Sequence, residues 1–197
     1  IEKGLPGPGL LAHTVLSKYG DHLPLYRQED ILARHGIMIR RSTLCDWAAS
    51  AAELARPLWE LMRREVLASQ AIWTDDTIVR MLAPLRTKNC RLWVYIGDES
   101  HPYSVYDFTT DRSRDGPEKF LAGYSGYLQA DAYGGYDGIY AGGGVVEVAC
   151  MAHCRRYWWE ARTTEPRRAH EALSFIGRLN ELEEQFRQAN LKGDSLR

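Results

Sequence analysis

Ile72–Leu82 (IWTDDTIVRML) and Ser125–Tyr140 (SGYLQADAYGGYDGIY) are the two stretches that decide the fold of this chain. Each places a carboxylate, Asp75 or Asp131, in or directly after an apolar run that is typical of a β-strand. A carboxylate beside a buried strand is costly unless a cation neutralises it, so the pair predicts a shared metal site. The alternative is that both are ordinary turn or cap residues at strand ends.

The composition bounds the fold and the partners. The 197 residues are 45% hydrophobic, enough for the core of one domain and a smaller appended region. Lys and Arg number 25 against 26 Asp and Glu, so any nucleic-acid surface must come from local clusters. Four cysteines, no signal peptide and no membrane-length apolar run predict a protein of the reducing cytoplasm and not of a membrane.

Residues 1–70 are predicted to be helical. Two amphipathic stretches, Leu10–Gly20 and Leu25–Gly36, precede a longer one that runs to about residue 67. A glycine turn followed by a basic helix start resembles a helix-turn-helix, with Ser42 or Thr43 as the helix cap. The residues predicted to face DNA are Arg40, Arg41, Ser42 and Thr43. The alternative is a plain helical hairpin with a solvated basic end.

Residues 71–197 alternate strands and helices. Three strand-like runs are followed by a short helix, a fourth strand at 127–133, a glycine-rich connection, a fifth strand at 145–153 and a helical segment from Cys154. This order predicts an α/β, ribonuclease-H-like domain with a mixed five-stranded sheet and flanking helices. In that fold the first and fourth strands are neighbours, so Asp75 and Asp131 converge. Two convergent carboxylates predict two divalent ions, Mg²⁺ or Mn²⁺.

Six motifs spread over essentially the whole chain carry a family resemblance: Asp21–Ile37, Arg41–Trp47, Asp75–Thr77, Arg91–Tyr95, Leu128–Asp137 and Cys150–Arg156. Together they resemble the transposases of the insertion-sequence-66 family. It implies a DDE-type transposase that cleaves and transfers insertion-element DNA with two metal ions, working on transposon ends and target DNA as a homo-oligomer. By motif position Asp75 matches the first catalytic acid and Asp131 the second, whereas Asp76 is a neighbour that does not bind the metal.

The sequence departs from the family pattern at three points. The third acid, a Glu in an Asn-x-x-Glu setting, is not found, so we expect the chain to stop short of it and to be inactive alone. Ile78 and Met151 stand where the family has Pro and Trp, which concerns packing more than chemistry. A cysteine-rich zinc-binding module is absent. Two rival functions remain open: a structure-specific nuclease of the same fold, and a non-catalytic DNA-binding remnant.

The segment Cys150–Arg156 (CMAHCRR) has two interpretations. Cys150, His153 and Cys154 are potential zinc ligands, but a single cluster of this kind favours reduced structural cysteines, and zinc is not expected. The resemblance places His153 near the metal site, where it would support the scissile phosphate or contact a residue that itself binds the metal. Arg155 and Arg156 would bind the DNA backbone; the alternative is a solvated helix start.

The aromatic residues of the strands are expected to form the core. Alternation predicts packing across strands for Trp93, Tyr95, Tyr103 and Tyr106. Tyr133 and Tyr136 follow shortly after Asp131. They could either pack in the core or stack on an unpaired base.

Overall fold

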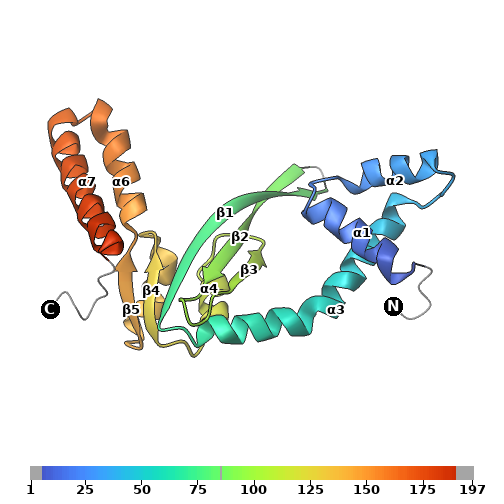
Figure 1. Cartoon of the computed structure of the whole chain (residues 1–197), viewed down its shortest axis with the longest axis horizontal. Coiled ribbons are helices and arrows are strands. Elements are labelled where there is room, and N and C mark those ends of the chain that lie inside the picture. Colours follow the sequence, from blue (N-terminus) through green and yellow to red (C-terminus); the bar gives the residue numbers. More distant parts are fainter. Residues whose placement is uncertain (1–5, 85, 190–197) are drawn as a thin grey trace. The chain divides into compact units, whose positions relative to one another are not determined.

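A computed structural model of the chain describes residues 6–84 and 86–189 (Figure 1). The chain divides into two compact units, Ile1–Arg64 and Glu65–Arg197. Among the described residues, no helix is both long and apolar enough to cross a membrane.

The first unit is helical. Its core consists of Leu25, Leu44 and Trp47. The partly buried apolar side chains that pack against it are Leu10, Leu11, Leu32 and Ile39. Gln28 is buried, and its side-chain amide donates to the carbonyl oxygens of Thr14 (3.3 Å) and Leu23 (3.1 Å). Because a buried amide is costly without partners, these bonds fix the first helix against the second. The helices are α1 (Pro8–Tyr19), α2 (Leu25–Arg34) and α3 (Arg41–Leu67), the last of which continues into the second unit.

The turn between α2 and α3 contains the glycine that the sequence analysis expected there. Gly36 has a φ of 78°, a conformation that favours glycine and ends α2. The expected cap at Ser42 or Thr43 is wrong, because α3 already begins at Arg41 and both side chains lie in its first turn. The helix therefore starts without either hydroxyl at the N-cap position.

The second unit contains the predicted mixed five-stranded sheet. Its order is β3-β2-β1-β4-β5; β1, β2 and β3 are antiparallel, whereas β4 runs parallel to both β1 and β5. The predicted fold class, α/β with flanking helices in the ribonuclease-H-like order, is confirmed, including the neighbouring first and fourth strands. The strands are β1 (Ala71–Ala83), β2 (Arg86–Ile96), β3 (Ser104–Thr109), β4 (Gly126–Ala130) and β5 (Val145–Ala149).

Short helices connect β3 to β4 and β4 to β5, and a helical hairpin follows the sheet (Figure 1). The expectation that the fifth strand extends to residue 153 is wrong: β5 ends at Ala149, and Cys150 is the N-cap of the next helix. The pairing of β5 with β4 stops where β4 itself ends, at Ala130. The helical elements are α4 (Asp115–Phe120), η1 (Gly134–Tyr136), α5 (Asp137–Ala141), α6 (Met151–Glu160), η2 (Ala161–Thr163) and α7 (Pro166–Gln188).

One face of the sheet is packed against α4 and η1. Tyr95 is buried and stacks on Phe120 of α4, with ring centroids 3.6 Å apart. Trp93 and Tyr136 form a T-shaped pair with ring centroids 6.2 Å apart. Tyr136 is itself buried, so the stacking of this ring on an unpaired base is ruled out. Such aromatic pairs carry much of the burial in a small core.

The opposite face of the sheet is apolar and exposed. Tyr103 and Tyr106, which were expected to pack in the core, have 41% and 56% of their surface exposed. The strand alternation puts Tyr106 on the face away from Val105, which is buried. The large apolar side chains exposed on this face, which we call the open face, are Trp73, Ile96, Tyr106, Phe108, Tyr127 and Val146.

Strands β1 and β2 extend past the rest of the sheet. The pairing of β1 with β4 covers only Ala71–Trp73, whereas its pairing with β2 continues to Ala83. Both strands of this two-stranded extension expose most of their side chains.

Candidate metal centre

Three potential metal ligands converge at the carboxyl end of β4. Ligand atoms of Asp75, Asp131 and His153 all lie within 4.8 Å of one another, and no other such group of three is found among residues 6–84 and 86–189. The parallel pairing of Trp73 with Gln129 explains the meeting of the two acids: Asp75 and Asp131 each follow two positions later and share a face. The convergence expected from the sequence is therefore present.

The donor set fits a hard divalent ion. Asp131 and His153 each have 16% of their side-chain surface exposed, whereas Asp75 has 54%, so the group is open to solvent on one side. His153 Nε2 lies 3.8 Å from Asp75 Oδ2. Two carboxylates suit Mg²⁺ or Mn²⁺, and an added imidazole favours Mn²⁺ over Mg²⁺.

His153 lies on a different element from the one predicted. It is in the first turn of α6 and not at the end of a fifth strand, because the strand-to-helix change comes at Cys150. This turn places the ring next to Asp75, which fits the expected contact with a candidate metal ligand, whereas the contact with a phosphate stays a prediction. From the sequence, His153 was singled out near the metal site, but not as one of its ligands.

Asp76 is held by two arginines. Its side chain is only 2% exposed, and it accepts a hydrogen bond at Oδ2 from Arg91 Nη1 (2.7 Å). At Oδ1 it accepts two from Arg112, one from Nη2 (2.8 Å) and one from Nε (3.0 Å). Both carboxylate oxygens are therefore engaged by arginine side chains.

Arg112 joins Asp76 to the candidate metal ligands. Its Nη2 also lies 3.2 Å from Asp131 Oδ2, and its guanidinium carbon stacks 4.0 Å above the centre of the Tyr133 ring. The Tyr133 hydroxyl donates to the Arg112 carbonyl oxygen. Burial would lower the pKa of Arg112, but the hydrogen bonds and charges of Asp76 and Asp131 outweigh it and raise the pKa.

Sequence reasoning missed Arg112. It lies between β3 and α4, in a segment without hydrophobic periodicity. Nothing in the spacing of TTDRSRDG indicates which of its charged residues points toward the sheet. The contact depends on the path of that loop, which a short-range pattern does not encode.

The cysteines lie beside this centre without joining the group of ligands. Burial would raise the pKa of the Cys150 thiol, but the backbone N–H groups of His153 and Ala152 lower it on balance. A thiol at the start of a helix is expected to gain thiolate character in this way. Neither Cys150 nor Cys154 belongs to the converging set, so the geometry offers oxygen and nitrogen donors instead of a thiolate zinc site.

The predicted DNA-contacting residues lie in both units. Arg155 and Arg156 are exposed on α6, with their guanidinium carbons 5.8 Å from the rings of Trp159 and Tyr157 respectively. In the first unit, Arg40, Arg41 and Ser42 are exposed and Thr43 is half-buried.

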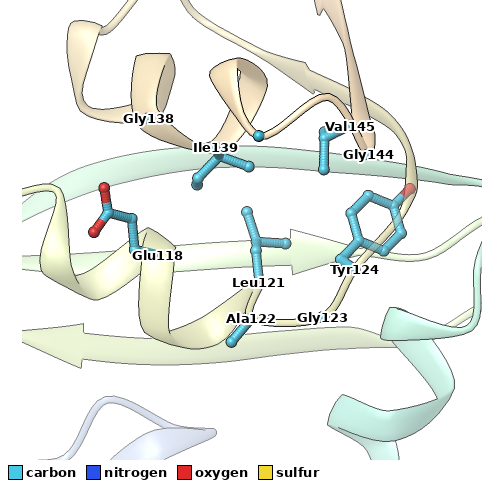
Figure 2. A pocket seen from close by; sticks show the side chains of 10 residues that line it. Glu118, Leu121, Ala122, Gly123, Tyr124, Gly138, Ile139, Gly144 and Val145 are labelled. Atoms are coloured by element: carbon cyan, nitrogen blue, oxygen red, sulfur yellow. The ribbon is translucent and has the colours of Figure 1, made fainter.

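A separate hollow of about 260 Å³ lies between α4 and α5. Figure 2 shows Leu121 and Ile139 pointing toward one another across it, with Glu118 at one end and Tyr124 at the other. None of the three converging ligands lines it, so it is distinct from the metal centre.

Comparison with known proteins identifies similar sequences over nearly the whole chain. Residues 3–196 match the transposase IS66 family. Three proteins of Sinorhizobium fredii (strain NBRC 101917 / NGR234) are similar: uncharacterized protein y4hP, 34% identical over 80% of this chain; y4qI, 34% identical over 81%; and y4jD, 31% identical over 95%. The matched segments make up 30%, 32% and 40% of those proteins, so the chain spans about a third of the length of these relatives.

Proposed function

Because this chain belongs to the IS66 family of transposases, we propose that its second unit supplies two catalytic acids of a DDE-type transposase, Asp75 and Asp131. The proposal rests mainly on one observation: these carboxylates and His153 have ligand atoms within 4.8 Å of one another. The reaction would be metal-dependent cleavage of element-end DNA, followed by attack of the freed 3′-hydroxyl on target DNA.

The residues of the candidate centre would have different roles in such a site. When bound, divalent ions would activate the attacking oxygen and stabilise the leaving one. Asp75 and Asp131 would hold them, with His153 as a nitrogen donor from α6. Asp76 does not take part directly, because both of its carboxylate oxygens are occupied by arginine side chains.

DNA contacts are proposed for both parts of the chain. Residues 1–70 would form a helix-turn-helix-like DNA-binding region, with Arg40, Arg41, Ser42 and Thr43 toward DNA, and residues 71–197 would belong to the catalytic domain. On α6, Arg155 and Arg156 would contact backbone phosphates next to the metal centre. Pairing of two element ends would require a homo-oligomer, which light scattering with end DNA would detect.

The proposal is tested by measuring the affinity of the chain for Mn²⁺ with electron paramagnetic resonance. We expect Asp75→Asn and Asp131→Asn each to weaken binding at least about tenfold, because each removes a charged ligand. Asp137→Asn is the matched control: an exposed carboxylate from the connection after β4, which should leave the affinity unchanged. Equal binding by all four proteins would exclude this metal site.

Activity assays on the full-length protein would separate the alternatives. Strand transfer that is lost in Asp75→Asn would support a transposase, whereas metal-dependent cutting without transfer would favour a structure-specific nuclease. DNA binding without any cutting in the presence of Mn²⁺ would favour a non-catalytic remnant.

A further inference from the structure

We propose that Arg112 is a positioning residue that serves as a built-in counter-cation for Asp131 and thereby sets how tightly the candidate centre binds a divalent ion. Asp76 would act through Arg112 as its anchor. This inference rests on the proposed function, because it assumes that Asp131 is a metal ligand.

The geometry gives Arg112 one fixed position between two carboxylates. Asp76 receives two hydrogen bonds from it, and a third contact, at 3.2 Å, reaches Asp131 Oδ2. The Tyr133 ring supports the guanidinium from one side. A planar guanidinium can bridge two carboxylates in this way, which a single ammonium group cannot.

The charges show why such a bridge affects metal binding. Three carboxylates, those of Asp75, Asp76 and Asp131, lie close together and would repel one another without cations. Arg91 neutralises Asp76 from one side, and Arg112 is shared between Asp76 and Asp131. An incoming ion must therefore compete with Arg112 for Asp131, while the positive charge of the guanidinium repels it.

Arg91 provides the matched control within the same network. Both arginines donate to Asp76, at 2.7 and 2.8 Å, but the contact with Asp131 is made by Arg112. A change at Arg91 disturbs the buried carboxylate without releasing Asp131. Any difference between the two substitutions therefore reports on the contact with Asp131.

The test is Mn²⁺ titration of the whole chain by calorimetry, with thermal unfolding measured with and without the ion. For Arg112→Gln we expect Mn²⁺ to bind about three- to tenfold more tightly, since a nearby positive charge is lost. The metal-free protein should melt at a lower temperature than wild type, and Mn²⁺ should raise its Tm by more. Arg112→Lys keeps the charge but cannot bridge both carboxylates, so its Mn²⁺ affinity should lie between those of wild type and Arg112→Gln. Arg91→Gln should change the affinity less than Arg112→Gln does.

Asp76→Asn is expected to change the Mn²⁺ affinity in the opposite direction. It provides the test if the Arg112→Gln protein does not fold. Without the anchoring charge, Arg112 pairs more fully with Asp131, so Mn²⁺ should bind more weakly. Weaker or unchanged binding in a folded Arg112→Gln protein overturns the proposal and leaves Arg112 with a structural role, as does tighter binding in Asp76→Asn. Failure of the proposed function looks different: wild type and Asp131→Asn would then bind Mn²⁺ equally or not at all.

Discussion

At the scale of single residues, Asp98 ties the start of β1 to the turn between β2 and β3. Its carboxylate accepts hydrogen bonds from the backbone N–H groups of Gln70 (2.7 Å), Ser100 (3.0 Å) and His101 (3.1 Å). These contacts hold the pKa of Asp98 below its ordinary value of 3.8, and the hydrogen bond from Gln70 has the largest effect. One ionised side chain thus connects two segments that are 28 positions apart in the sequence.

The lowered pKa predicts how stability depends on pH. A carboxyl group whose pKa is lower in the folded state stabilises the protein fully above its unfolded pKa, and this stabilisation is lost as the pH falls through the folded value. We expect Asp98→Asn to melt at a lower temperature than wild type at pH 7, and the gap to narrow below about pH 4. Thermal unfolding by circular dichroism between pH 2.5 and 7 measures it. A gap that stays constant over this range would show that ionisation of Asp98 does not contribute.

The residues of the candidate centre differ in how far the sequence could predict them. Asp75 and Asp131 follow from strand patterns and a motif resemblance, because strand order and parity bring them together. Arg112 was not predicted, because its contacts depend on a loop that carries no periodic signal. Local patterns thus predict residues on regular elements better than residues that approach from loops.

At the scale of elements, all five strands and their order could be predicted, but the ends of two strands could not. The fourth strand was expected to reach residue 133 and ends at Ala130, and the fifth was expected to reach residue 153 and ends at Ala149. The run VVEVACMAH is apolar throughout, so hydrophobicity does not mark where the strand ends. The end is set by the pairing partner, since β4 stops at Ala130. The consequence is functional, because the helical turn determines where His153 and the two following arginines point.

Helix α6 yields a prediction about DNA binding. Replacing Arg155 and Arg156 together by Ala should lower DNA affinity and reduce the slope of log affinity against log salt by up to about two, one for each lost phosphate contact. Filter binding or fluorescence anisotropy at several salt concentrations measures both quantities. Arg187→Ala is the control: an exposed arginine of α7 that is paired with Glu183, for which we expect no change. An unchanged slope in the double variant would remove both α6 arginines from the DNA interface.

At the scale of the whole molecule, the second unit combines a packed face with the open face of its sheet. Monomeric proteins rarely leave several large apolar side chains exposed side by side. We expect the folded chain to bind the dye ANS, and Tyr106→Lys with Phe108→Lys on the edge strand β3 to reduce the fluorescence. Tyr157→Lys replaces an equally exposed aromatic ring on α6 and should have little effect. Equal fluorescence in all three proteins would place the dye elsewhere.

The two-stranded extension of β1 and β2 implies that one strand has two different stabilities along its length. At Ala71–Trp73 the strand is flanked by β4, whereas from Ile78 to Ala83 its described pairing is with β2 alone. Backbone amides are protected from exchange with deuterium by the structure that must open to expose them. Protection factors from hydrogen–deuterium exchange should therefore fall along β1, so that the start of the strand reports global unfolding and its end reports fraying of a hairpin. Asp75 lies close to the transition between these two regimes, where a rigid sheet gives way to a ribbon that opens on its own.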